Sequence, residues 1–165
     1  MPLQSFGSNP SGGRYIHIST RGDNGGTGAK DSPFATLQKA INIAGAGDTI
    51  LVASGRYMGA GDKGYAARIS HKSGTADAPI TIKGQGGPVI LDNSDDTSTG
   101  AVHSLRVQNS KHWVIEGVGF TGAAQNSKAS LVDRRVGRAF EQYHPEGLRV
   151  LRQRRPGGAD LRAQP

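Results

Sequence analysis

Short strands separated by glycine-rich loops are the first feature in the pattern of apolar and polar positions. Residues 15–19 alternate between apolar and polar side chains, as in a strand with one buried face. Residues 48–52 form a mostly apolar run, typical of a buried strand, and residues 55–57 close it. Short apolar segments recur at 80–82 and 89–90. The pattern predicts a protein built mainly of β-strands.

A single amphipathic helix is predicted between the first two strands. Ser32 can serve as its N-cap, because a serine hydroxyl accepts a hydrogen bond from a free backbone N–H of the first turn. Pro33 suits the first helical position, where no N–H is needed. Apolar side chains then recur on one face at helical spacing, at Phe34, Leu37, Ile41 and Ala44. We therefore expect a helix of about three turns over residues 32–44, with one stripe to bury.

Four apolar positions recur at an offset of 25 residues, which indicates an internal repeat. The matched pairs are Ile80 and Leu105, Ile82 and Val107, Val89 and Val114, and Ile90 and Ile115. Another step of 25 leads from Val107 to Val132. A step of 30 leads back from Ile80 to Ile50, which an extra loop at 59–64 would explain. A period of this size in a glycine-rich chain is typical of a solenoid, and two short strands per period favour a β-helix.

One winding of such a helix cannot be stable by itself. It buries about four aliphatic side chains worth about 1.5–3 kcal/mol each, whereas ordering roughly 25 residues costs about 1–2 kcal/mol per residue. Windings must therefore stack, and the open edge of the first winding must be covered. The helix at 32–44 precedes the first full winding and is predicted to be this cap. The alternative is an antiparallel β-sandwich whose strands happen to share this spacing.

Composition narrows the class of protein. The 25 glycines and 5% aromatic residues disfavour a helical bundle, and the absence of cysteine excludes disulfides and cysteine-bound metals. No apolar run approaches the roughly 18 residues of a membrane span. The first residues lack the pattern of a secretory signal peptide. We therefore expect no membrane partner, and the sequence leaves the location of the protein open.

The net charge of +7 is unevenly distributed. Residues 1–132 carry a net charge of +3, whereas residues 133–165 carry +4, with eight arginines and no lysine. We divide the chain into a flexible leader at 1–14, an ordered body at 15–132 and an arginine-rich tail at 133–165 without the repeat. The tail is predicted to be disordered or the product of a frameshift. The alternative is an arginine-rich arm that binds nucleic acid or another polyanion.

Several segments resemble the N-terminal part of right-handed parallel β-helix proteins of the pectate-lyase-like superfamily. They are residues 15–19, 23–27, 32–40, 47–52, 55–57, 78–84 and 114–117. The chain is similar to the family 9 pectate lyases and to the chondroitinase B and alginate lyase group over roughly residues 15–122. The resemblance implies an all-β, right-handed parallel β-helix, a solenoid with one N-terminal capping α-helix. About three to four coils are expected, truncated before the rest of the helix.

The resemblance also implies an activity for the parent protein. In these lyases a lysine or arginine removes the proton next to a uronate carboxylate, and a calcium ion held by acidic residues neutralises that carboxylate. Neither group aligns with a residue of this chain, so we expect no catalytic residue and an inactive fragment. The parent would cleave an acidic polysaccharide of the pectate, alginate or chondroitin type by β-elimination. The alternative is a β-helix module for adhesion or attachment, without enzymatic activity.

Two places in the sequence offer candidate binding residues. Asp92, Asp95 and Asp96 bring three carboxylates into five residues, and calcium prefers oxygen ligands. A solvated corner loop is the alternative for this segment. His112 and Trp113 could stack on a sugar ring, because an exposed indole offers a flat apolar face. Packing at a corner of the helix is the alternative for Trp113.

Lys83 and Lys111 lie near predicted strand ends and are the remaining candidates for a proton-abstracting base. A β-helix face carries many such lysines, so their positions alone do not assign that role. The expected partners are an acidic polysaccharide and, through an uncapped last winding, further copies of the chain. Secretion is what the resemblance implies, although no signal peptide supports it.

Overall fold

A computed structural model describes residues 7–10, 12–58, 65–93 and 103–121, and the backbone of three further strands between residues 131 and 151. The elements in chain order are β1 (Tyr15–Ile18), α1 (Leu37–Ile43), β2 (Thr49–Met58), β3 (Tyr65–Ser70), β4 (Ile80–Asp92), β5 (His103–Gln108), β6 (Trp113–Glu116), β7 (Gly119–Thr121), β8 (Leu131–Asp133), β9 (Arg138–Ala139) and β10 (Leu148–Leu151). The predicted dominance of β-strands is confirmed, although β2 and β4 are longer than expected, with 10 and 13 residues.

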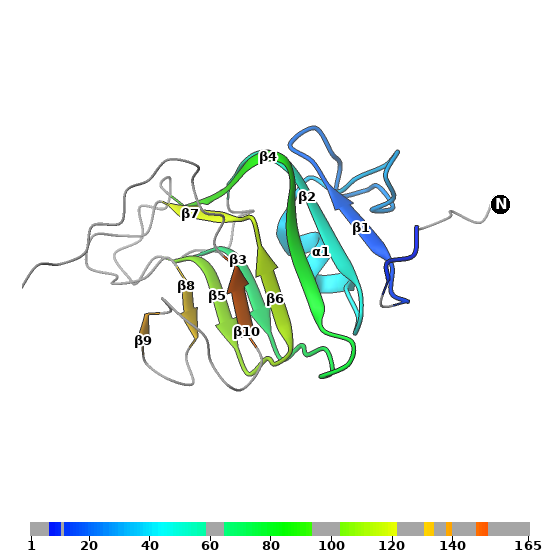
Figure 1. The fold of residues 1–165 in the computed structure, drawn as a ribbon. Helices are drawn as coiled ribbons and strands as arrows, with labels where there is room; N and C mark the ends of the chain where they lie inside the picture. Colours follow the sequence, from blue (N-terminus) through cyan, green and yellow to red (C-terminus); the bar gives the residue numbers. More distant parts are fainter. Residues whose placement is uncertain are drawn as a thin grey trace, which may run out of the picture.

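The strands form two sheets, and the chain passes from one to the other as it winds (Figure 1). One sheet has the order β1-β2-β4-β6-β10, with β7 beside β4, and the other has the order β3-β5-β8-β9. All of these pairs are parallel except β8 with β9. β4 and β5 therefore belong to different sheets, although they follow each other in the chain. This is the predicted parallel β-helix, and the parallel pairing excludes the antiparallel sandwich.

The register shows that the predicted 25-residue repeat is wrong. Ile82 pairs with Ile115, an offset of 33 residues, and Ile69 pairs with Val107, an offset of 38. Ile82 and Val107 consequently belong to different sheets, and the predicted match joined a strand of one sheet to the next strand of the other. Short apolar strands look alike in sequence, and loops of unequal length between them remove a constant period. Only the pairing of backbone groups reveals the true winding.

Aliphatic side chains stack in register inside the helix. Ile16, Ile50, Ile82 and Ile115 follow one another across β1, β2, β4 and β6, and each is at most 1% exposed. On the other sheet, Ile69 lies beside Val107 in the same core. Each such side chain contributes about 1.5–3 kcal/mol by its removal from water. Stacked windings are thus held together as the solenoid argument requires.

Two glycines permit the close approach of successive windings at a corner. A Cβ on Gly84 would lie 2.2 Å from the carbonyl oxygen of Gly117, a distance that no side chain can accept. Gly117 itself has φ 65°, a conformation that favours glycine. At these two positions glycine is therefore required by the close packing of the backbone and by a positive φ.

The helix is shorter than predicted, and its N-cap is Thr36 rather than Ser32. Thr36 Oγ1 accepts a hydrogen bond from the backbone N–H of Lys39, and α1 has seven residues. The residues predicted as its first turn instead run beside β1. The backbone N–H of Phe34 donates to His17 O, and Phe34 O accepts from the N–H of Ser19, both at 2.9 Å. This segment is extended because it satisfies the backbone groups at the free edge of β1.

The predicted capping role of the helix is confirmed, and a side-chain amide performs part of it. Gln38 of α1 accepts a hydrogen bond from the backbone N–H of Arg68 at 2.7 Å and donates to Arg68 O at 3.0 Å. Arg68 lies in β3, the edge strand at the first end of its sheet. The amide thus takes the place of a neighbouring strand at that edge.

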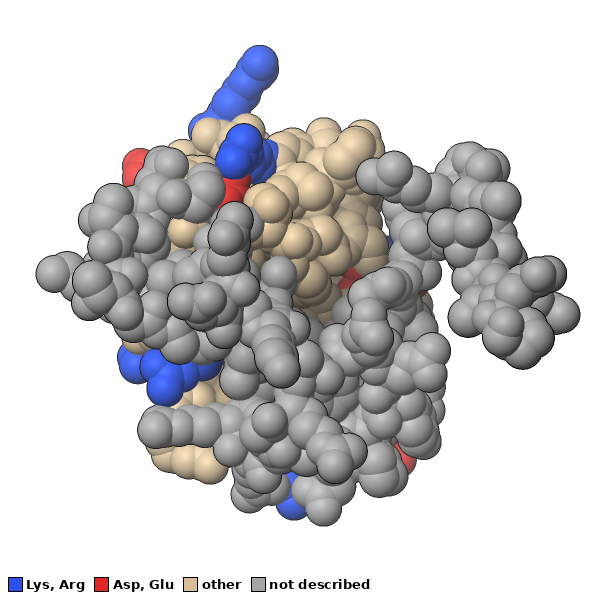
Figure 2. Space-filling model, turned by 90° about the vertical axis from the view of Figure 1, so that its left-hand side faces the viewer, with Lys and Arg blue, Asp and Glu red and all other residues tan. Residues whose placement is uncertain are grey.

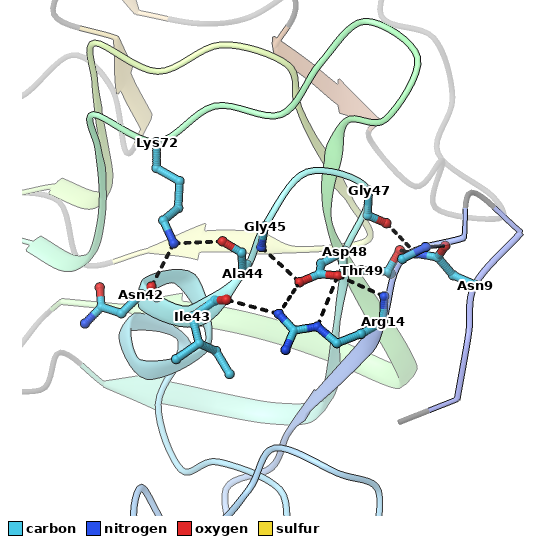
Figure 3. Close-up of polar contacts among 11 residues, drawn as sticks. Asn9, Arg14, Asn42, Ile43, Ala44, Gly45, Gly47, Asp48, Thr49 and Lys72 are labelled. Atoms are coloured by element: carbon cyan, nitrogen blue, oxygen red, sulfur yellow. Dashed lines mark hydrogen bonds and ion pairs between the residues drawn. The ribbon is translucent and has the colours of Figure 1, made fainter. Parts of the chain in front are cut away.

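Polar contacts close the turn between α1 and β2 (Figure 3). Asp48 is bound by the Arg14 side chain at 2.7 Å and by the backbone N–H groups of Arg14 and Gly45. Burial alone would raise the pKa of Asp48, but these hydrogen bonds outweigh it and hold the pKa below its ordinary value. The Lys72 ammonium donates to the carbonyls of Asn42 and Ala44, both at 2.7 Å, at the C-terminal end of α1.

Ordered contacts extend beyond both ends of the predicted body at 15–132. Asn9, within the segment set apart as leader, is buried and donates to Gly47 O at 2.6 Å and Thr49 Oγ1 at 2.8 Å. β10, within the segment set apart as tail, pairs in parallel with β6. The origin of the tail stays a prediction.

Candidate functional site

Arginine side chains from two neighbouring windings meet on the outward side of β3 and β5. Arg68 is the register partner of Arg106, and Ser70 is the partner of Gln108. Ile69 and Val107, which lie between them on the two strands, point into the core. Because side chains alternate along a strand, these four residues point outward. We call them the β3–β5 face.

The two guanidinium groups share one aromatic ring. Arg68 Cζ lies 5.3 Å and Arg106 Cζ 5.8 Å from the centre of the Tyr65 ring, within the range of a cation–π interaction. Tyr65 itself is only 8% exposed. Among the side chains that the structure describes, no carboxylate forms an ion pair with either arginine. Two like charges therefore lie side by side without neutralisation from that part of the chain.

Polar side chains also lie in the turns that directly follow β3 and β5. His71 and Asn109 occupy equivalent positions of successive windings, and both have left-handed backbones, with φ 51° and 45°. The His71 ring contacts Ser70 Oγ through Nδ1 at 2.9 Å and Asn109 Nδ2 through Nε2 at 3.0 Å. These contacts fix the polar groups beside the arginines.

The outward side of the other sheet has a different electrostatic character. Lys83 and Glu116 are register partners, and Lys83 Nζ lies 3.4 Å from Glu116 Oε2. Lys83 is thus paired with a carboxylate, while Lys111 is exposed and its backbone N–H donates to Ser73 Oγ. Neither lysine lies on a strand of the β3–β5 face, and their role as a base stays a prediction.

Asp92, the described residue of the predicted calcium site, is bound by an arginine. Asp92 is fully buried, and its carboxylate forms an ion pair with Arg56. A guanidinium on the carboxylate opposes a second cation there, so Asp92 as placed fits an ion pair better than a calcium ligand. Asp95 and Asp96 lie outside the described residues. Within the described part of the chain no group of three or more acidic or histidine side chains could hold a metal, and calcium binding stays a prediction.

The predicted sugar-stacking role of Trp113 requires correction. Its side chain is 1% exposed in the core, and the indole N–H donates to Lys72 O at 2.8 Å. Both faces of the ring are covered, so the alternative of packing inside the helix is the right one for Trp113. His112 is half-buried with φ 56°, and its carbonyl accepts from the N–H of Ile80. The contact of His112 with a sugar stays a prediction.

The arginine pair was missed because the assumed repeat of 25 separates its members. A usable signal was present: Arg68 and Arg106 each stand between apolar residues, in Ala67-Arg68-Ile69 and Leu105-Arg106-Val107. Matching these two triplets would have shown the offset of 38 and the adjacent charges.

Basic side chains are dispersed over the view in Figure 2. The described lysines and arginines visible there form separate groups, one of them beside acidic residues, rather than one continuous basic patch. The described residues also include no helix that is long and apolar enough to cross a membrane.

Residues 16–149 match the model of a protein family described as Pel9A-like, right-handed β-helix region. The chain therefore belongs to this family of right-handed parallel β-helices, within the pectate-lyase-like superfamily that the sequence indicated. The matched region extends past residue 132, where the sequence analysis placed the end of the repeat.

Among solved structures, a rhamnogalacturonan lyase shares the fold, with a TM-score of 0.59 and 24% identity over 66% of this chain. The match spans 28% of the length of that lyase. A GH136 lacto-N-biosidase from Eubacterium ramulus aligns with a TM-score of 0.47 and 13% identity, over 82% of this chain and 23% of its own. A search of curated protein sequences finds no significant match.

Proposed function

We propose that this chain is part of a carbohydrate-active β-helix protein whose whole acts on an acidic polysaccharide. Membership of the Pel9A-like β-helix family over residues 16–149 is the observation that carries the proposal. The name of the structural neighbour, a rhamnogalacturonan lyase, agrees with a polymer of this class. The chain matches about a quarter of that enzyme, so the activity is proposed for the longer parent protein.

The reaction we propose for the parent is β-elimination at a uronate. A base removes the proton next to the carboxylate, the electrons of that C–H bond form a double bond, the bond from the sugar carbon to the glycosidic oxygen breaks, and the leaving oxygen takes up a proton. A positive group on the carboxylate stabilises the charge that develops during this step. We expect the present chain to bind such polymers without cleaving them, because the family's base and calcium ligands have no counterpart among its residues.

Incubation of the chain with pectate, alginate, chondroitin or rhamnogalacturonan tests both the expected binding and the expected lack of cleavage. The double bond formed by elimination absorbs in the ultraviolet, and we expect no increase in absorbance with or without added calcium. Retention on immobilised pectate but not on a neutral glucan is the expected binding result. An increase in absorbance would contradict the expected inactivity, and equal retention on both polymers would contradict the preference for acidic chains.

A module for adhesion or attachment is a second candidate, favoured by the absence of an aligned catalytic residue. It predicts binding to a surface polymer by the parent as well, without cleavage. Assaying the parent protein for ultraviolet absorbance separates the two functions, since only the lyase generates unsaturated uronate.

A third candidate is polyanion binding by the tail, favoured by its net charge of +4. Replacing Arg134, Arg135, Arg154 and Arg155 by glutamine in the full chain tests it. This function predicts weaker, less salt-dependent retention on heparin and on DNA. Unchanged retention would exclude it.

A further inference from the structure

We propose that Arg68 and Arg106 form a subsite for the carboxylate groups of an acidic glycan. The inference rests on the proposed function and adds a location and a recognition mode to it. The two arginines are register partners on parallel strands, which places their backbones about 4.8 Å apart. Both guanidinium groups lie close to the ring of Tyr65, so they point to the same region of the surface.

This pair differs from the three basic residues that form ion pairs in the described part of the chain. Arg14 is neutralised by Asp48, Arg56 by Asp92 and Lys83 by Glu116. Each of these pairs joins different windings or loops and so contributes to the fold. Arg68 and Arg106 repel each other, and no described carboxylate compensates for that repulsion. An anion from outside the chain would do so.

The geometry of the guanidinium group favours a carboxylate as the bound anion. A guanidinium is planar and offers two parallel N–H donors that match the two oxygens of a carboxylate. Ser70 and Gln108 stand one step further along the same face and can exchange hydrogen bonds with sugar hydroxyls. Tyr65 is too deeply buried to stack on a sugar ring. Recognition at this face therefore depends on charge, and a polymer of uronates provides carboxylates at regular intervals.

Binding of oligogalacturonate to the full chain, measured by titration calorimetry, tests the subsite. The variant is Arg68→Gln with Arg106→Gln. Arg21→Gln with Lys30→Gln is the matched control, because it removes two exposed positive charges from the loop between β1 and α1. We expect about tenfold weaker binding or more for the first variant and less than a twofold change for the control. Thermal unfolding of each variant verifies that it is folded.

Two further measurements identify the anion and the mode of contact. Methyl-esterified oligogalacturonate lacks the charge and is expected not to bind, whereas a sulfated glycan of equal charge is expected to bind less tightly. The variant Arg68→Lys with Arg106→Lys retains both charges without the planar donors, and we expect it to bind severalfold less tightly than the parent chain. Wild-type affinity in this variant, or a preference for the sulfated glycan, would overturn carboxylate recognition by the arginine fork.

The outcomes also separate this inference from the function on which it rests. If the chain binds oligogalacturonate and the double glutamine variant binds equally well, the subsite is refuted while the proposed function stands. If the unaltered chain binds no acidic glycan, both are refuted.

Discussion

The first edge of the β-helix and the β3–β5 face use charged residues in opposite ways. At the edge, three polar side chains have partners within the chain: Arg14 binds Asp48, Gln38 binds the backbone of β3, and Lys72 binds the end of α1. On the face, Arg68 and Arg106 contact an aromatic ring and no described carboxylate. Charges at the edge stabilise the fold, whereas charges on the face are available to a ligand. Substitutions at the edge should therefore change stability, and those on the face should change binding.

The largest loss of stability is expected for Trp113→Ala. The indole fills the core and donates to Lys72 O, next to the contacts that close α1. Removal of a large buried ring costs about 3–5 kcal/mol. Chemical denaturation measures the change, and His112→Ala, at a half-buried neighbour, serves as the control. A loss below about 1 kcal/mol at Trp113 would contradict its place in the core.

The second-largest loss of stability is expected for Asp48→Asn. The amide cannot pair with the Arg14 guanidinium as an anion, and hydrogen bonds to a charged group contribute about 1.5–3 kcal/mol. The unaltered chain should also lose this contribution in acid. Because the folded-state pKa of Asp48 is depressed, the stabilisation is complete above the ordinary aspartate range of about 4 and is lost as the pH falls through the folded value.

Denaturation across this pH range measures the loss for both proteins. The curve for Asp48→Asn should fall less steeply in acid than that for the unaltered chain. Parallel curves would mean that the Arg14–Asp48 pair does not couple stability to pH.

A smaller change in stability, with a change in association, is expected for Gln38→Ala. The substitution leaves the N–H and the carbonyl of Arg68 without their partners at an edge strand, at a cost of about 1–3 kcal/mol if water does not replace them. An unpaired edge also favours pairing with another chain. Unfolding and sedimentation measure the two effects.

Two variants sharpen this test of the edge. Gln38→Glu retains an acceptor for the N–H of Arg68 but lacks the donor to Arg68 O, and it should fall between the alanine variant and the unaltered chain. Asn42→Ala, which alters only an exposed contact with Gln38, is the control. Equal association of all three variants would show that Gln38 does not protect the edge.

The smallest effect on stability is expected for Arg68→Gln with Arg106→Gln. The loss of the contacts with Tyr65 is opposed by relief of the repulsion between two like charges, and we expect a net change within about 0.5 kcal/mol. The midpoint of denaturation provides the measurement. A destabilisation as large as that of Asp48→Asn would place these arginines with the structural charges of the edge and remove the contrast between the two regions.

Short strands, a single capping helix and the superfamily could be predicted from the sequence, because local hydrophobic patterns and a few loop motifs encode them. The first and last residues of the helix could not be predicted in this way. Ser32 and Pro33 form a good local start signal, but the free edge of β1 requires backbone partners from this segment, and that requirement prevails over local capping.

The alternation of apolar and polar residues along the strands encodes the burial of the core aliphatics, since Ile16, Ile50, Ile82 and Ile115 lie inside as their patterns indicate. The strand pairing sets which windings they join. Loops of unequal length set the offsets to 33 and 38 residues, and no local pattern records a loop's path. The same register brings Arg68 beside Arg106 and buries Trp113, so the charged face and the loss of a stacking ring follow from strand pairing between distant segments.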